Sequence, residues 1–340
     1  MSLAAAKRGE RHAWRLPALP RRGAVSWFEV GLLIVCVALV AFELPQNLRD
    51  VIVLTFLFGG LALAWNIAGG YAGLISFGHA AFFGIGAYTS TILFVHAGVT
   101  PWIGLWLGAL LSSAVGAFLA VICARLRGPF FILSTLAAAE VVRIGALNWS
   151  SLTGGPEGLS ILPVASLASM VFSSKTVYAA LMLAYLVICY AVTKALEASR
   201  FGYYLAAVRD DEDAAGAAGI NPLLARTGAM ALSAALTGLG GSLFAQYFLY
   251  LDPTFVISPD LSFQLALLPA VGGLGTAIGP VLGSLLITPL SELLRAYLGN
   301  MAAGLHLVIY SAGLIGVMLY FPSGLAGALN RLAAGGKRKP

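Results

Sequence analysis

The sequence predicts an all-α polytopic membrane protein with about ten transmembrane helices, and its composition and one long uncharged stretch are the main reasons. Of the 340 residues, 59% are hydrophobic and only 10% are charged. Residues 51–124 contain no Asp, Glu, Lys or Arg. Because about 20 apolar residues in a helix span the hydrocarbon core of a bilayer, this stretch is long enough for about three crossings. A soluble domain of this size does not bury so much apolar surface.

Apolar runs follow one another along the rest of the chain. They lie at about 27–44, 51–69, 79–96, 101–124, 129–147, 176–194, 225–249, 261–278, 280–298 and 304–321. An even number of crossings places both termini on one side. Basic residues gather in the two tails and in the loop between the sixth and seventh runs, so we predict this side to be the cytoplasm. Residues 148–175 contain a single Lys and no Arg, and we predict them to be periplasmic.

The basic N-terminus predicts a cytoplasmic tail rather than a cleaved leader. Residues 1–26 are rich in Lys and Arg. The apolar run that follows is long for the apolar part of a signal peptide, and no A-x-A-like cleavage site closes it convincingly. We therefore expect a basic tail at 1–26, a transmembrane domain at 27–322 with a cytoplasmic loop at 195–224, and a second basic tail at 323–340. The expected location is a bacterial inner membrane.

The residues do not form a recognisable catalytic, cofactor or metal site. There is no GxxxxGK[ST] loop for nucleotide phosphates, and no GxSxG, HExxH or paired-carboxylate arrangement. Cys36, Cys123 and Cys189 all lie inside apolar runs without ligand spacing, which predicts buried thiols. The sequence therefore predicts a protein that is not an enzyme.

Glycine and polar residues interrupt the apolar runs at 69–79 and at 272–280. Non-helical backbone at membrane depth requires protein or a water-filled cavity around it, and such breaks are typical of translocation routes. Close helix packing by small residues is the equally weighted alternative. Glu140 and Arg143, three residues apart near the outer end of one run, predict a structural ion pair, with a functional role as the alternative.

The loop at 195–224 holds most of the charges of the central chain. Gly202 precedes a stretch of helix formers at 203–218, and Gly219 and Pro222 predict a helix stop. We expect one short cytoplasmic helix that carries the acidic cluster 210–213. The charge density alone is also compatible with a solvated helix that has no partner.

The order of residues in this loop resembles that of a known family. The matching residues are Ser199, Arg200, Gly202, Ala207, Arg209, Asp210, Asp211, Glu212, Ala214, Ala215, Ala217, Gly219, Ile220 and Asn221. Further matching stretches are 69–88, 126–131, 147–149, 152–155, 272–280 and 321–325. Together they are similar to the permease subunits of branched-chain amino acid ABC importers, of the LivM type. Phe130 replaces the usual tyrosine, and the N-terminal tail lies outside the resemblance.

The resemblance implies a large importer-permease bundle that translocates Leu, Ile, Val or similar amino acids without hydrolysing ATP itself. The implied partners are a second homologous permease, two cytoplasmic ABC ATPases, a periplasmic solute-binding protein and the membrane lipid; no nucleic acid is expected. A urea or short-chain amide importer is the alternative, and an ion-coupled secondary transporter is a weaker one. The residues implied in ATPase coupling are Arg200, Gly202, Arg209, Asp210, Asp211, Glu212 and Gly219.

A route for such amino acids should be mostly apolar, with scattered polar groups and no strong charge that would trap a zwitterion. The uncharged stretch 51–124 fits this description, so we expect the second and third runs to line the route. The candidate residues are Asn66, Ser76, Gly78, His79 and Tyr88. His79 next to a glycine-rich helix start is equally compatible with a packing role.

Overall fold

The fold is an all-α membrane bundle, as predicted. The computed structural model describes residues 27–42, 45–126, 128–162, 166–298 and 324–328. Eight stretches of the described chain are long and apolar enough to cross a membrane. The first predicted run forms α1 (Trp27–Ala41), which has 15 residues. The tenth predicted run, 304–321, lies outside the described residues.

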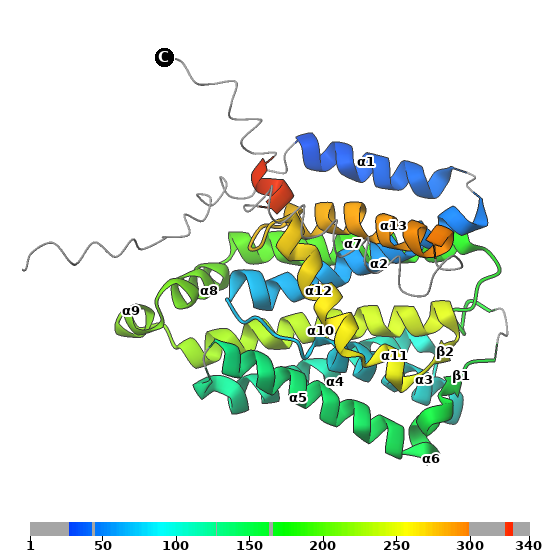
Figure 1. Ribbon diagram of the computed structural model, residues 1–340, viewed down its shortest axis with the longest axis horizontal. Helices are drawn as coiled ribbons and strands as arrows, with labels where there is room; N and C mark the ends of the chain where they lie inside the picture. Colours follow the sequence, from blue (N-terminus) through cyan, green and yellow to red (C-terminus); the bar gives the residue numbers. More distant parts are fainter. Residues whose placement is uncertain (1–26, 43–44, 127, 163–165, 299–323, 329–340) are drawn as a thin grey trace, which may run out of the picture.

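The long helices pack side by side along the longest axis of the molecule (Figure 1). They are α2 (Gln46–Asn66) with the π-helical η1 (Ile67–Tyr71), α3 (His79–Ala97), α4 (Pro101–Ile122) with η2 (Cys123–Arg125), α5 (Pro129–Asn148), α7 (Lys175–Ala198), α10 (Pro222–Phe248) and α13 (Ile278–Leu298). The shorter α11 (Pro253–Val256) and α12 (Pro259–Gly272) together form the remaining candidate span, and α12 crosses the front of the bundle at an angle (Figure 1).

The short elements mark the two ends of the bundle. At one end lie α8 (Arg200–Asp210) and α9 (Glu212–Ala217). At the other end lie α6 (Ser150–Thr153), η3 (Gly155–Glu157), and the antiparallel strands β1 (Leu159–Ser160) and β2 (Tyr250–Leu251) (Figure 1). The predicted cytoplasmic and periplasmic loops are thus at opposite ends of the molecule.

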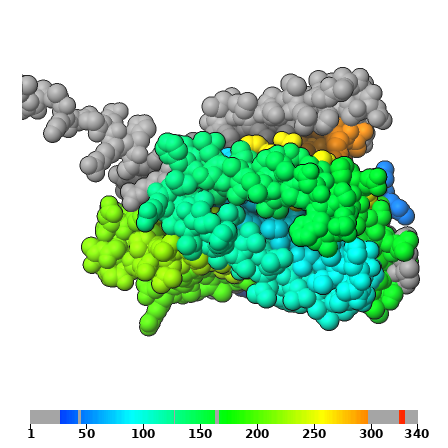
Figure 2. All heavy atoms as spheres, turned by 90° about the horizontal axis from the view of Figure 1, so that it is seen from below, coloured from blue at the N-terminus to red at the C-terminus, as the bar shows by residue number. Residues whose placement is uncertain are grey.

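The central helices are α2 and α10, while α4 and α5 are peripheral. In the most apolar 18 residues of each span, 89% of the residues are buried in α2 with η1 and 78% in α10. The corresponding values are 33% for α4 with η2 and 22% for α5. Figure 2 shows the face that α4 and α5 cover. Their exposed residues are large and apolar, such as Phe118 and Val141. This outer surface suits lipid or another membrane subunit. Cys36, Cys123 and Cys189 are free and buried, as predicted.

Glycines bring the backbones of α3, α4 and α10 together. A Cβ atom on Gly86 of α3 would lie 2.1 Å from the carbonyl oxygen of Gly238 in α10, and one on Gly241 would lie 2.0 Å from that of Phe83. Such contacts are possible only without side chains. Small residues at these crossings stabilise the bundle through close van der Waals contact.

We predict that Gly116→Ala lowers thermal stability while Gly145→Ala does not. A Cβ on Gly116 would lie 2.5 Å from Cβ of Ala234, so α4 and α10 must separate, which costs about 1–3 kcal/mol. At Gly145, on the exposed face of α5, the added methyl group meets nothing within 4 Å. Unfolding temperatures of the purified protein in detergent check this pair; equal values for both variants would contradict the close packing of α4 on α10.

Candidate functional site

Within the interruption at 69–79, residues 72–78 form a non-helical, largely buried segment between η1 and α3. The amides of Ala72 and Leu74 still donate to the carbonyls of Ile67 (3.2 Å) and Ala68 (2.8 Å) at the end of η1, but residues 72–78 form no regular helix, and Ser76 and Gly78 are buried. Their polar backbone groups have side-chain partners: the indole N–H of Trp65 donates to the Ser76 carbonyl (2.8 Å), and the Gly78 amide donates to Ser76 Oγ (3.1 Å). The protein itself therefore satisfies the non-helical backbone at membrane depth.

Hydroxyl groups from three other helices hold the same segment. The Phe77 amide donates to Thr135 Oγ1 of α5 (3.1 Å), and the Ala80 amide donates to Ser262 Oγ of α12 (3.0 Å). His79 Nε2 lies 2.8 Å from Ser233 Oγ of α10. Thr135, Ser233 and Ser262 did not emerge from the sequence as candidates. The only sign of them in the sequence is that they are isolated hydroxyl residues in apolar runs. The neighbouring residues do not indicate which segment each hydroxyl contacts.

The five residues proposed for the route fall at three places. Ser76, Gly78 and His79 lie together in the segment just described. Asn66 lies toward the α8 end, where its side chain accepts from the Gly275 amide (2.9 Å) and donates to the Thr276 carbonyl (3.0 Å). Tyr88 lies toward the strands, with its hydroxyl 3.4 Å from the Leu251 carbonyl oxygen. All five are buried, so within this chain they form a polar interior rather than an open channel.

The two glycine-rich interruptions contact each other at the α8 end. A Cβ on Gly70 would lie 2.0 Å from Asn66 Oδ1 and 2.6 Å from the Gly275 nitrogen. Gly275 itself has a φ of +69°, which favours glycine. The segment 273–277 between α12 and α13 therefore docks on the π-helical end of α2. Single-turn π-helical distortions within α-helices are frequent at functional sites.

The loop predicted as one helix at 203–218 consists of two helices, and that part of the prediction was wrong. α8 ends at Asp210 and α9 begins at Glu212. Asp211 between them has an extended backbone, and its carboxylate accepts from the amides of Asp213 and Ala214 (both 3.0 Å). An Asp that caps a new helix in this way competes with continuation of the preceding one.

Glycines shape both ends of this helical pair. Ser199 caps α8 through a bond from the Gly202 amide (3.1 Å), and a Cβ on Gly202 would lie 2.2 Å from the Leu196 carbonyl oxygen. The turn between α7 and α8 therefore requires glycine. Gly219, with a φ of +85°, ends the α9 segment as the sequence predicted.

The charged residues of the loop divide into an outer and an inner set. Arg200, Asp211 and Asp213 are exposed, and the Asp210 side chain is 63% exposed. Glu212 instead pairs with Arg226 at the start of α10 (3.0 Å). Arg209 also faces the bundle: its Nη1 donates to the Gly70 carbonyl oxygen (2.9 Å) and its Nη2 lies 3.3 Å from Asp210 Oδ1. Arg209 thus joins α8 to the contact between the two interruptions.

Glu140 and Arg143 form the ion pair that the sequence predicted. Arg143 Nε donates to Glu140 Oε2 (2.8 Å), and Nη2 donates to Oε1. Glu140 is the twelfth of the 20 residues of α5, so the pair begins nearer the middle of the span than its predicted outer end.

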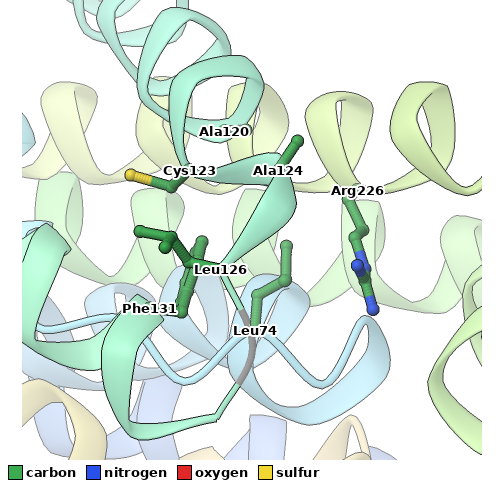
Figure 3. Close-up of a pocket in the computed structure, with 7 residues that line it drawn as sticks. All are labelled: Leu74, Ala120, Cys123, Ala124, Leu126, Phe131 and Arg226. Carbon is green, nitrogen blue, oxygen red and sulfur yellow. The ribbon is translucent and has the colours of Figure 1, made fainter.

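A small cavity and a larger open one lie at opposite ends of the described bundle, and none of the five route candidates lines either of them. The one in Figure 3 has a volume of about 10 Å³, with apolar side chains of η2 and α5 such as Cys123 and Phe131 on one side and Arg226 on the other. It has room for about one water molecule. An open cavity of about 730 Å³ lies at the opposite end, where Asp50, Lys175 and Tyr247 line it. Lys175 Nζ donates to Asp50 (2.7 Å) there.

Comparison with known proteins gives a consistent family. The family model described as "Branched-chain amino acid transport system / permease component" matches residues 47–322. The chain is 29% identical over 294 residues to the high-affinity branched-chain amino acid transport system permease protein LivM of Salmonella typhimurium, covering 79% of this chain and 68% of that protein. LivM of Escherichia coli gives the same identity and coverage.

The similarity extends to a second kind of permease. The permease protein LivH of Salmonella typhimurium is 25% identical over 298 residues, which covers 83% of this chain and 95% of LivH. No solved structure matches the chain.

Proposed function

The chain belongs to the family of permease components of branched-chain amino acid transport systems, and from this premise we propose that it is the membrane-spanning subunit of an ABC importer for Leu, Ile, Val or similar small amino acids. The family match across 47–322 carries the proposal. The chain is a multi-pass membrane protein, and the fold agrees with a transport role: the described residues form eight candidate spans with polar groups in the interior of the bundle, and the sequence has no nucleotide-binding motif.

The proposed partners are a second homologous permease, two cytoplasmic ABC ATPases and a periplasmic solute-binding protein. The likeness of this one chain to both LivM and LivH supports a pair of related permeases. ATP hydrolysis is assigned to the ATPases, and the permease is non-hydrolysing. Its contact with them is α8 and α9, where Arg200, Asp210, Asp211 and Asp213 are available at the surface. Gly202 and Gly219 shape this unit.

Movement of α8 and α9 is transmitted to the membrane-spanning helices through the contacts of Arg209 and Glu212. Arg209 contacts the Gly70 carbonyl at the end of α2, and Glu212 contacts Arg226 of α10. Both α2 and α10 are central helices, so a displacement of the loop acts directly on the middle of the bundle. This is the type of rigid linkage that alternating access requires.

The proposed route runs along the second and third predicted spans, next to the partner permease. Its candidate residues remain Asn66, Ser76, Gly78, His79 and Tyr88. Because these side chains are buried in this chain, the route opens only when neighbouring segments move apart. The non-helical residues 72–78 are the natural place for such movement, since side chains rather than a helical ladder hold the backbone of Ser76, Phe77 and Gly78.

Uptake by the assembled transporter tests the function. The chain is co-expressed with its partner permease and ATPases, reconstituted in liposomes and supplied with ATP and binding protein. Uptake of radiolabelled leucine, reduced by excess isoleucine or valine, is the expected result. Uptake of urea instead would favour the amide importer, and uptake driven by an ion gradient without ATP would overturn the ABC assignment.

We expect both termini in the cytoplasm, on the same side as α8 and α9. Labelling of single cysteines should show that the two ends of the bundle lie on opposite sides of the inner membrane. Suitable positions are Ser173, which is exposed just before α7, and Gly216 in α9, where an added side chain meets nothing within 4 Å. A membrane-impermeant maleimide added to intact spheroplasts should label Ser173→Cys and spare Gly216→Cys until the membrane is opened. The reverse pattern would invert the topology.

A further inference from the structure

Asp260 lies deeper in the membrane-spanning bundle than its position between two predicted spans suggests. It lies between the predicted runs 225–249 and 261–278, and the alternation of crossings places this stretch in an outer loop. In the structure it is the second residue of α12. The middle of the bundle is marked by Tyr185 of α7, whose hydroxyl donates to the Leu236 carbonyl of α10 (2.9 Å). Gly86 of α3 contacts Gly238 at nearly the same level.

The residues on both sides of Asp260 contact α3 close to this level. Ile257 Cγ1 would lie 2.4 Å from a Cβ on Gly84, which is two residues from Gly86. Ser262 Oγ accepts from the Ala80 amide (3.0 Å), six residues from Gly86. With a helical rise of about 1.5 Å per residue, Asp260 lies roughly 3–9 Å from the middle of the bundle, toward the α8 end. The hydrocarbon core extends about 15 Å to each side of its centre, so this carboxylate is inside it.

Asp260 is nevertheless exposed on the surface of this chain. Among the described residues, its side chain has no hydrogen-bond or ion-pair partner. A carboxylate at this depth is too costly to face lipid, and acidic residues within membrane spans typically line a water-filled path or pair with a cation. Glu140 on the neighbouring α5 already has Arg143 as its partner.

The surroundings of Asp260 suit a zwitterion with an apolar side chain. Phe263, one turn further along α12, is 44% exposed, and its ring packs edge-on against Phe77 with centroids 4.6 Å apart. Phe77 belongs to the non-helical segment 72–78, where Ile75 is also 44% exposed. An anionic group therefore stands beside an open apolar surface formed by α12 and the non-helical segment 72–78.

We propose that Asp260 faces the translocation route and binds the ammonium group of the amino acid in transit, while Phe263 and Ile75 contact its side chain. This inference rests on the proposed function and assigns it a substrate contact. It departs from the sequence-based expectation of a route without charge: one carboxylate attracts the ammonium, and exposure to water keeps the interaction weak enough for release. A Lys or Arg of the partner permease is the other cation that this carboxylate could meet, and the experiment separates the two.

The test compares Asp260→Asn and Asp260→Glu with the wild type in the reconstituted transporter. Asn keeps the shape and removes the charge, so leucine uptake per assembled complex should fall about tenfold or more, which corresponds to ~1.4 kcal/mol of lost binding. Glu should restore part of it. ATP hydrolysis and the amount of co-purified partner permease should stay at wild-type values. Glu157→Gln, an exposed acid at the outer end of the bundle, serves as the matched control and should transport normally.

Wild-type uptake by an assembled Asp260→Asn transporter would overturn the proposal. Loss of the partner permease from both Asp260 variants would do so as well, because the carboxylate would then be an interface residue. Accessibility is the second measurement: Asp260→Cys should react with a water-soluble thiol reagent, and leucine delivered by binding protein should slow the reaction. Val141→Cys, at the exposed residue directly after Glu140 in α5, should not react.

The accessibility measurement also keeps the inference separate from the proposed function. If the wild-type transporter moves no branched-chain amino acid, the proposed substrate fails, while aqueous reactivity of Asp260→Cys would still place the residue on a route. An unreactive Asp260→Cys, with leucine uptake intact in the wild type, would refute the route assignment alone.

Discussion

Reversal of Asp210 and Asp213 to lysine in one variant should abolish stable association with the ATPase subunits while the permease still inserts and folds. Both carboxylates are exposed. Asp210 lies 3.3 Å from Arg209 Nη2, but Arg209 reaches the Gly70 carbonyl oxygen through Nη1, so this inward contact does not need the Asp210 carboxylate. Asp211 and Glu212 are poor choices for this purpose. The first caps α9 and the second pairs with Arg226, so reversing them would also disturb the structure of the loop.

The loss of ATPase association should be large because each substitution reverses the sign of a charge. Complementary charge at an interface attracts, while like charges opposite one another cost several kcal/mol. Two reversals change the loop by four charge units, so the ATPases should be lost during purification. Asp210→Asn with Asp213→Asn removes the charge without reversing it and should give an intermediate yield. The measurement is the amount of ATPase that co-purifies with the tagged permease.

Glu157→Lys provides the control, because Glu157 is an exposed acid in η3 at the opposite end of the bundle. It should retain the ATPases fully. Normal ATPase capture and uptake by the double lysine variant would show that the acidic cluster is only a solvated surface. The coupling contact would then lie elsewhere on α8 and α9.

The sequence was sufficient for the fold class because its main signal, hydropathy over windows of about 20 residues, depends on the membrane and not on tertiary contacts. The charged loop was also recognisable, since charge between apolar runs is local information. Its division at Asp211 was not predicted. The break forms because the Asp211 carboxylate accepts hydrogen bonds from the amides of Asp213 and Ala214. The residues around it are good helix formers, so the sequence pattern predicts a continuous helix.

The contacts between helices inside the membrane region could not be predicted from the sequence, because they join residues that are far apart in the chain. Both glycine-rich interruptions were predicted, but not that Asn66 joins them through Gly275 and Thr276. Hydropathy likewise placed Asp260 in an outer loop. Its depth is set by the contact of Ile257 with Gly84 in another helix, which no local pattern encodes.

Gly78→Leu should block leucine uptake while assembly with the ATPases remains intact. Gly78 precedes α3 in the buried non-helical segment, and a Cβ there would lie 3.0 Å from the Thr135 carbonyl oxygen of α5. One methyl group is tolerated if the neighbour moves by a few tenths of an ångström. The rest of a leucine side chain must enter the space between residues 72–78 and α5, where it would hinder their separation. Uptake should fall to the level of liposomes without transporter.

Two further variants make this prediction decisive. Gly78→Ala should reduce uptake only partly, since its Cβ is accommodated. Gly145→Leu adds the same side chain to α5 where nothing lies within 4 Å, and it should transport normally. If Gly78→Leu leaves no folded subunit and Gly78→Ala transports at the wild-type rate, Gly78 is a packing residue and the second and third spans lose their support as the route. If both Gly78 variants assemble and only transport declines, in the order of side-chain size, movement of the 72–78 segment is part of the transport cycle.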